Sequence, residues 1–226
     1  MMGSPDDEEE RGENEGPRHE VTISKPFYMG VYEVTVEQFD QFVKDSGYAW
    51  EKRKVSYTPR SDHPVSCVTW DDAREFCKWL SKKTGKTVSL PTEAQWEYAC
   101  RAGTTTAYCF GDDVDDLGEY GHYDMDGWDG SAVHSPEAAP VGSFKPNAWG
   151  LYDMHGNVNE YCEDYVSKAY SAEDKLDPKG PAEGTRRVMR GGSWRNVPEC
   201  CRSAFRGQAR PAIGGPREGF RVVVAE

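Results

Sequence analysis

Residues 190–194 read RGGSW, and two further blocks follow before the end of the chain: CRSA at 201–204 and GFRV at 219–222. Two longer blocks precede them, LPTEAQWEY at 90–98 and NAWGLYDMHGNV at 147–158. These blocks are rich in tryptophan, tyrosine and glycine, which supply large apolar surfaces and allow tight backbone turns. The five blocks, in this order, are the feature of the sequence that decides the fold.

In kind and in order, the blocks resemble those of the formylglycine-generating enzyme family, also called sulfatase-modifying factors. The resemblance runs from about Val21 to Val224, nearly the whole chain. It implies an α+β domain related to the C-type-lectin fold, with few helices, a twisted antiparallel sheet and many loops. It also implies a candidate activity, because these enzymes oxidise a substrate cysteine to formylglycine with oxygen and Cu(I).

Composition limits the classes of function. The chain has 226 residues, enough for one large domain with a substantial core. A formal net charge of -12 disfavours nucleic acid as a partner, because the average field repels a phosphate backbone. No apolar run approaches the roughly 18 residues of a membrane span, and no signal peptide is visible. We expect a bacterial protein of the cytoplasm or, as part of a longer parent, of the cell surface.

The chain is expected to have two parts. Residues 1–20 are rich in aspartate and glutamate, which is typical of a solvated and flexible leader. Residues 21–226 form the formylglycine-generating-enzyme-like domain. The seven cysteines show neither a CxxC pattern nor zinc spacing, so we expect most of them to be reduced and buried.

Helix starts are predicted after three threonines. Thr35 and Thr92 are each followed three residues later by a glutamine, which makes a capping box. Thr69 is followed by acidic residues that suit the first turn of a helix, and Gly85 is a C-cap signal for that helix.

Strands and loops are predicted around these helices. Phe27–Met29 and the residues after Gly30 are expected to form a short strand pair. After Gly103 the helical periodicity stops, which predicts short strands and long loops. Long loops must satisfy their buried backbone groups, and bound metal ions are one way to do so.

The family resemblance implies a copper site of two thiolates, because soft sulfur ligands select Cu(I). In the family, one cysteine lies three residues after the serine of Gly-Gly-Ser, and the other lies eight after it. Counted from Ser193, these positions are Asn196 and Cys201, so the first ligand is absent. Cys200 could replace it, although neighbouring side chains in a strand point to opposite faces. The candidate catalytic residues are Cys201, Cys200 and Ser193; the alternative for Cys201 is a buried structural thiol.

The resemblance also implies structural calcium at residues 155–160, HGNVNE. Calcium prefers oxygen ligands, here the side chains of Asn157 and Glu160 and the carbonyls of Gly156 and Val158. The tryptophans that flank the glutamate in the family are missing from this chain. The alternative is a turn in which the asparagine and the glutamate bond the local backbone.

A second calcium site is a weaker expectation. Asp124, Asp126 and Asp129 offer carboxylate oxygens, but their spacing differs from the family pattern and from an EF-hand loop. The alternative is a solvated acidic turn.

The C-terminal loops, residues 195–217, differ from the asparagine-rich sequence common in relatives, and many of the differences can be reached from an asparagine codon by changing adenines. This resembles the variable proteins of diversity-generating retroelements, which use the same fold as a frame for a hypervariable surface. The candidate ligand-binding residues are Arg195, Asn196, Val197, Cys200, Phe205, Gly207, Ala209, Ile213, Gly214, Gly215 and Pro216. Arginines and aromatic residues are common in binding hot spots. The alternative for Arg190, Arg202, Arg206 and Arg221 is structural pairing with acids or loop carbonyls.

Two functions are consistent with these observations. The first is a non-catalytic domain that binds a protein or peptide ligand through residues 195–217. The second is a copper-dependent oxidase that acts on a cysteine of a sulfatase-type peptide. The asparagine at position 196 favours the first.

Overall fold

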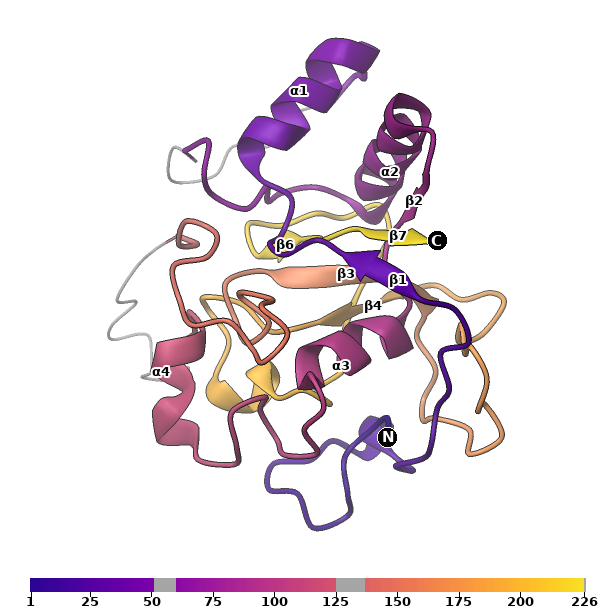
Figure 1. Ribbon diagram of the computed structural model, residues 1–226, viewed down its shortest axis with the longest axis vertical. Helices are drawn as coiled ribbons and strands as arrows, with labels where there is room; N and C mark the ends of the chain where they lie inside the picture. The colour runs from indigo at the N-terminus through magenta and orange to yellow at the C-terminus, as the bar shows by residue number, and fades with distance from the viewer. Residues whose placement is uncertain (51–59, 125–136, 226) are drawn as a thin grey trace.

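The computed structural model describes residues 1–50, 60–124 and 137–225 and places two sheets between a helical layer and a loop-rich layer (Figure 1). Within these residues, the helices and 3-10 turns are η1 (Glu13–Glu15), α1 (Val36–Ser46), α2 (Trp70–Thr84), α3 (Glu93–Arg101), η2 (Val114–Asp116), α4 (Leu117–Tyr120) and η4 (Pro198–Cys201). No helix in the described parts is both long enough and apolar enough to cross a bilayer.

The predicted helix starts are confirmed. Thr35, Thr69 and Thr92 each accept a hydrogen bond from the backbone N–H three residues on, and each is completed as a capping box. The predicted C-cap is also confirmed, because Gly85 adopts the left-handed conformation after α2. The short α4 was not expected, since four residues are too few to show helical periodicity.

The strands form two small sheets. They are β1 (Phe27–Met29), β2 (Thr87–Ser89), β3 (Asn159–Tyr165), β4 (Arg187–Arg190), β5 (Gly207–Ala209), β6 (Glu218–Gly219) and β7 (Val223–Ala225). One sheet is antiparallel in the order β1-β7-β2, and the other has the order β5-β4-β3-β6.

The expected α+β fold with antiparallel strand pairing is confirmed, except that one pair is parallel and one predicted strand pair was wrong. The second sheet is mixed, because β6 runs parallel to β3. In addition, β1 does not form a hairpin around Gly30. It pairs instead with β7, and Gly30 donates to the carbonyl of Val222 at 2.9 Å. The partner strand lies at the far end of the chain, so no local turn signal could reveal it.

The main core is aromatic. Phe39 of α1 stacks on Phe76 of α2 with ring centroids 5.8 Å apart, and Phe220 lies 5.4 Å from Phe76. All three rings are buried, and burial of each stabilises the fold by about 1.5–3 kcal/mol. A second cluster surrounds Trp96 of α3. The blocks at 90–98 and 219–222 thus contribute their large apolar residues to the interior.

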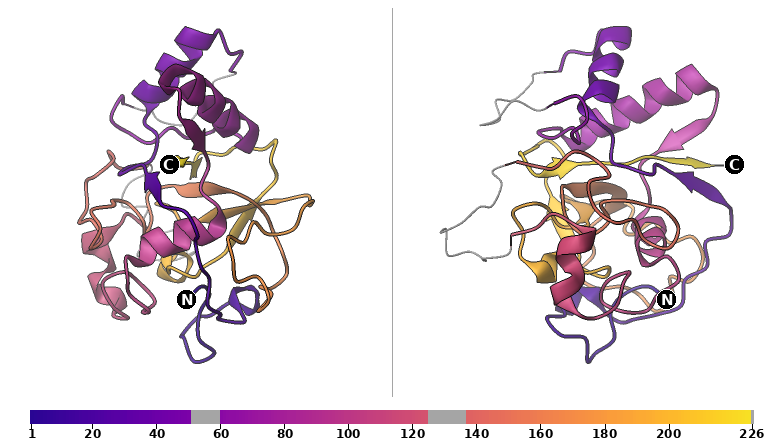
Figure 2. Two further views of the ribbon diagram at one scale, coloured as in Figure 1. Left: turned by 45° about the vertical axis from the view of Figure 1, so that its right-hand side comes forward. Right: turned by 60° about the vertical axis from the view of Figure 1, so that its left-hand side comes forward.

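The segment 1–20 packs against the domain, although its composition predicted a flexible leader. Met2 and His19 exchange two backbone hydrogen bonds, and both residues are buried with Glu15. Figure 2 shows the segment folded beneath α3. An ion pair with the C-terminal part of the chain fixes the acidic segment in place. Both Glu15 oxygens accept hydrogen bonds from Arg202, at 2.6 and 2.9 Å.

Candidate functional site

A double-glycine turn positions the candidate site. β4 ends at Arg190, and Gly191 and Gly192 follow with φ of +91° and +74°. A Cβ atom on Gly192 would lie 2.6 Å from the sulfur of Cys201. The turn therefore needs glycine, both for its left-handed backbone and for the close approach of η4. It brings Ser193 against the end of η4.

Asn196 lies at the centre of the polar groups in this site. Its side-chain oxygen accepts from the Ser193 hydroxyl at 2.6 Å and from the Asn159 amide at 3.4 Å. Its side chain also lies close enough to Cys200 to lower the pKa of that thiol, against the larger effect of burial. The structure thus brings together Ser193, Asn196 and Cys200, which the sequence had singled out separately.

Cys201 is fully buried behind this group. Burial raises the pKa of its thiol well above the usual value, and the neighbouring Cys200 raises it further. The thiol contacts the Val197 carbonyl at 3.8 Å. Burial also raises the pKa of the half-buried Cys200 thiol. Both sulfurs therefore favour the protonated form, which is a weak nucleophile and a weak metal ligand.

These donors do not fit a Cu(I) dithiolate. An amide oxygen stands at position 196, where the family resemblance expects a thiolate, and hard oxygen is a poor ligand for Cu(I). That oxygen is also already bonded by two neighbouring side chains. The described residues contain no group of three or more His, Cys, Asp or Glu side chains placed to hold a metal ion.

His155 supports η4 from behind, a role that sequence reasoning missed. Its Nδ1 atom donates to the Cys201 carbonyl at 2.8 Å, and its Nε2 atom accepts from the Cys109 N–H at 3.1 Å. These partners fix a neutral imidazole, buried beside the Cys100 sulfur at 3.8 Å. A single histidine in a loop carries no sequence signal for such a role, because its partners are distant in sequence.

Glu160 is a salt-bridge partner. Its two oxygens accept from Arg221 at 2.7 Å each, and one of them also accepts from the Trp96 indole at 2.8 Å. Both charged side chains are fully buried. The expected role of Glu160 as a calcium ligand does not fit this arrangement, because Arg221 already neutralises its carboxylate and engages both oxygens.

The side chain of Asn157 is also hydrogen-bonded within the protein. Its side-chain oxygen accepts from the Ala139 N–H at 2.9 Å, and its amide donates to Glu33 at 3.0 Å. Gly156 and Val158 add only backbone carbonyls to the expected ligand set, so calcium at residues 155–160 remains a prediction that these donors do not support. Burial and the neighbouring Asp153 raise the pKa of Glu33 well above its usual value.

The second expected calcium site is only partly described. The backbone N–H of Asp124 donates to the Asn196 carbonyl at 2.8 Å, so this end of the site adjoins Ser193 and Asn196. Asp126 and Asp129 lie outside the described residues, and the site remains a prediction.

The eleven candidate ligand-binding residues occupy different parts of the fold. Arg195 and Pro216 are exposed near η4, where the Trp194 indole donates to the Pro216 carbonyl at 3.5 Å. Ile213 is also exposed, but Gly214 is buried against the Val68 carbonyl. The remaining positions lie near η4, on or beside β5, or next to Gly214: Asn196, Val197, Cys200, Phe205, Gly207, Ala209 and Gly215.

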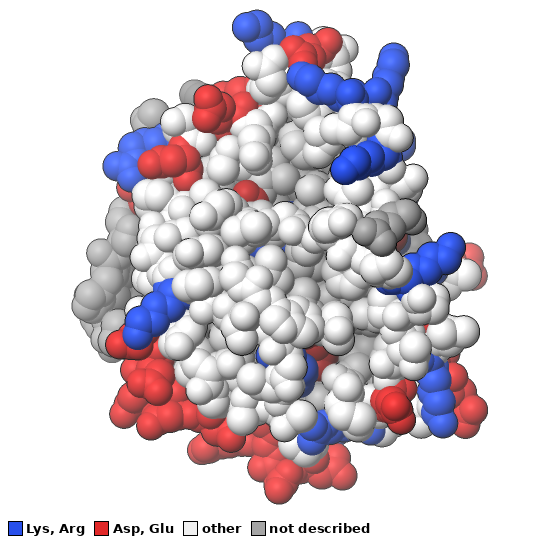
Figure 3. Space-filling view, viewed as in Figure 1, with Lys and Arg blue, Asp and Glu red and all other residues white. Residues whose placement is uncertain are grey.

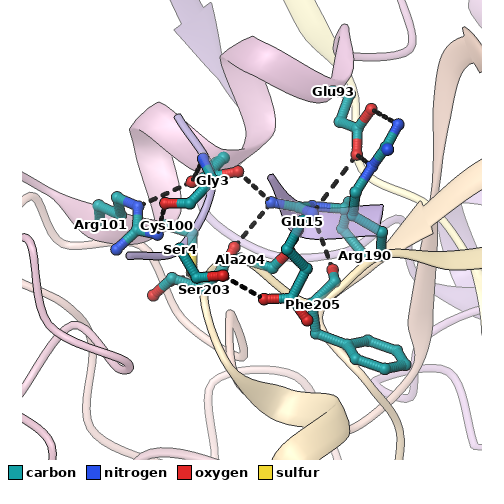
Figure 4. Close-up of polar contacts among 12 residues, drawn as sticks. Gly3, Ser4, Glu15, Glu93, Cys100, Arg101, Arg190, Ser203, Ala204 and Phe205 are labelled. Carbon is teal, nitrogen blue, oxygen red and sulfur yellow. Dashed lines mark hydrogen bonds and ion pairs between the residues drawn. The ribbon is translucent and has the colours of Figure 1, made fainter. Parts of the chain in front are cut away.

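Arg190, Arg202, Arg206 and Arg221 have buried structural partners, as the alternative interpretation predicted. Arg190 is fully buried and donates to Glu97 at 2.5 Å and to the Ser203 and Ala204 carbonyls (Figure 4). Arg206 binds both oxygens of Glu93 at 2.6 and 2.8 Å. These bonds fix the loops on either side of η4 to α3, so the candidate site has a rigid base.

Comparison with known proteins identifies the family. The whole chain, residues 1–226, matches the family described as "Sulfatase-modifying factor enzyme 1-like domain". The formylglycine-generating enzyme of Mus musculus is 32% identical over 97% of this chain and 71% of that protein. The chain belongs to the sulfatase-modifying factor family.

Two solved structures share the fold of this chain. PvdO from Pseudomonas aeruginosa matches with a TM-score of 0.89 and 33% identity, over 100% of this chain and 90% of that chain. Treponema denticola variable protein 1 matches with a TM-score of 0.82 and 26% identity, over 100% and 92%. The sulfatase-modifying factor fold therefore occurs in named enzymes and in a named variable protein, so the fold alone does not decide the activity.

Proposed function

We propose that this chain is a non-catalytic binding domain on a formylglycine-generating-enzyme fold. The observation that carries the proposal is the asparagine at position 196, whose side-chain oxygen accepts a hydrogen bond from the Ser193 hydroxyl. A copper oxidase of this family needs a thiolate there. The other thiol, Cys201, is buried and has a raised pKa.

The proposed binding surface is the part of residues 195–217 that surrounds η4. Arg195 and Pro216 are exposed there, and Asn196, Val197 and Cys200 are half-buried. Arginine, with a guanidinium that forms several hydrogen bonds, is a common hot-spot residue. The buried bonds of Arg190 and Arg206 support this surface from below, which keeps the binding geometry fixed and lowers the entropic cost of association. The ligand class is a protein or peptide.

The similarity to Treponema denticola variable protein 1 supports a further part of this proposal. This further part is that the residues around η4 of this chain are diversified, while the rest of the fold is kept. The test is the neighbouring DNA. We expect a near-copy of the coding stretch for residues 190–222 that differs at adenines, beside a reverse transcriptase gene. Absence of that copy contradicts diversification but leaves the binding role intact.

The non-catalytic role is tested by an activity assay with a positive control. The purified protein is incubated with Cu(I), oxygen and a Cys-x-Pro-x-Arg peptide, and the peptide is analysed by mass spectrometry. We expect no formylglycine, while a copper-loaded formylglycine-generating enzyme converts the same peptide. Conversion that is lost in Cys201→Ala contradicts a non-catalytic role.

One contact favours the alternative, a copper-dependent oxidase with an altered site. Cys200 adjoins Cys201 in η4, and the thiol of each affects or is affected by a neighbouring group of this site: Asn196 lowers the pKa of Cys200, and Cys200 raises the pKa of Cys201. If this pair bound Cu(I), conversion of the peptide would be lost in Cys200→Ala as well as in Cys201→Ala.

A further inference from the structure

The β1 strand has one free edge. β1 pairs with β7 on one side only, and in that sheet β7 is the central strand. Gly30 donates its N–H to the Val222 carbonyl. In the alternating antiparallel pattern, the main-chain N–H and C=O groups of Tyr28 therefore also face β7. The N–H and C=O groups of Phe27 and Met29 therefore point outward. No hydrogen bond joins these groups to another described residue.

A groove of about 690 Å³ runs along this edge. It is lined by residues before and within β1, by Tyr98 and Ala99 of α3, and by Trp149 and Leu151. Lys25 is the single charged residue among the described residues that line it. The groove is thus an apolar channel beside unpaired main-chain groups.

The aromatic walls of the groove are unusually exposed. Tyr28 is 61% exposed, Tyr98 is 53% exposed and Trp149 is 48% exposed. The Tyr98 and Trp149 rings lie 4.8 Å apart at an angle of 59°, so they form one platform. In Figure 3 the middle of this face carries few charged side chains, whereas acidic residues gather at the base of the molecule. Contiguous exposed apolar surface of this kind is typical of an interaction site.

We infer that the β1 edge binds an extended peptide segment, which adds a strand to the sheet and places alternate apolar side chains against Tyr98 and Trp149. Outward N–H and C=O groups at every second residue are the pattern that a strand satisfies. A strand presents side chains to one face at every second residue, which matches an apolar groove along one side of the edge. Because Lys25 is the single charged side chain among the described lining residues, the groove favours a segment with mostly uncharged side chains.

This surface is separate from the one proposed above. None of the residues lining the groove belongs to residues 195–217. A result that contradicts one proposal therefore leaves the other unaffected.

The experiment uses the full chain and a displayed library of short peptides that alternate apolar and polar residues. Selected peptides are labelled, and their affinity is measured by fluorescence anisotropy. Met29→Pro removes an outward N–H without removing a bond to β7, a change that edge strands tolerate. Met29→Ala is the matched control, because it shortens the side chain and keeps the N–H. We expect Met29→Pro and Trp149→Ala each to weaken binding about tenfold and Met29→Ala to weaken it less.

A second measurement tests the strand directly. In each selected peptide, every second residue is N-methylated in one of two registers. We expect one register to lose binding and the other to keep it, because only alternate N–H groups face β1. Equal loss in both registers, equal weakening by Met29→Pro and Met29→Ala, or selection of no peptide that prefers the wild type overturns the proposal. A homodimer in sedimentation that Met29→Pro dissociates also overturns it, because the edge is then covered by a second copy.

Discussion

The Ser193 hydroxyl donates a 2.6 Å hydrogen bond to the side-chain oxygen of Asn196. The family resemblance places the first copper cysteine of the oxidases at the position that this asparagine occupies. Under the proposed function, a neutral hydrogen bond replaces a soft metal ligand there. The consequences concern stability as well as activity, because the loop that carries both residues is fixed by close contacts.

The Gly191-Gly192 turn should not tolerate a side chain. Gly192→Ala places a Cβ atom 2.6 Å from the Cys201 sulfur and 2.9 Å from the Cys200 carbonyl, at a φ of +74°. We expect a loss of about 2–4 kcal/mol in the free energy of unfolding, measured by denaturant titration. Gly118→Ala is the control, because nothing lies near its Cβ position and its φ is not positive. A Gly192→Ala protein as stable as Gly118→Ala contradicts the close approach.

The acidic N-terminal segment should contribute strongly to stability. Glu15→Gln removes the bidentate carboxylate partner of the buried Arg202 and leaves Glu8 as the carboxylate that still accepts from it. Breaking a buried ion pair from one side typically costs about 3–5 kcal/mol, and because Glu8 remains we expect a smaller loss, about 2–3 kcal/mol, in thermal or denaturant unfolding. Glu13→Gln changes the same charge at an exposed position and should alter stability by less than about 0.5 kcal/mol. Equal effects of the two variants would show that the segment is not held by this bond.

These two cases show why some features were readable from the sequence and others were not. The capping boxes at Thr35 and Thr92 act over three residues, so their pattern is visible locally. Glu15 is paired with Arg202, 187 residues away, and its local composition alone indicates a flexible leader. Copper ligand positions could be counted from Ser193. By contrast, the support that His155 gives to η4 depends on the fold and has no local signature.

Asp164 should make stability fall as the pH rises from about 4 to about 7. Burial, helped by the charge of Glu93, raises the pKa of Asp164 to about 7, above its ordinary 3.8. The folded state therefore holds a proton that the unfolded state releases between about pH 4 and 7, and stability decreases across this window. Asp164→Asn should flatten that decrease and, at pH 8, be more stable than the wild type by roughly 2–4 kcal/mol. The measurement is denaturant unfolding at a series of pH values.

The control for this prediction is Asp40→Asn, which removes a carboxylate from an exposed position on α1. It should keep the pH dependence of the wild type. If Asp164→Asn kept that dependence too, the buried carboxyl would not be the titrating group.

Calcium should not act through residues 155–160. Glu160 and Asn157 are fully engaged within the protein, so we expect no rise in melting temperature that depends on them. The measurement compares thermal unfolding in excess calcium and in chelator. Any calcium-dependent rise should vanish when Asp126 and Asp129 are both changed to Asn. A rise that persists in that double variant and is lost in Glu160→Gln contradicts this prediction, because calcium then binds at residues 155–160.

The most direct test of the central claim is the affinity for Cu(I), measured by competition with a Cu(I) chelator for the wild type and for Asn196→Cys. We expect weak binding to the wild type, because one thiolate position holds an amide, and binding tighter by about two orders of magnitude or more in Asn196→Cys. Tight Cu(I) binding by the wild type that Cys200→Ala or Cys201→Ala abolishes would contradict it, because the site would then hold copper without a cysteine at position 196.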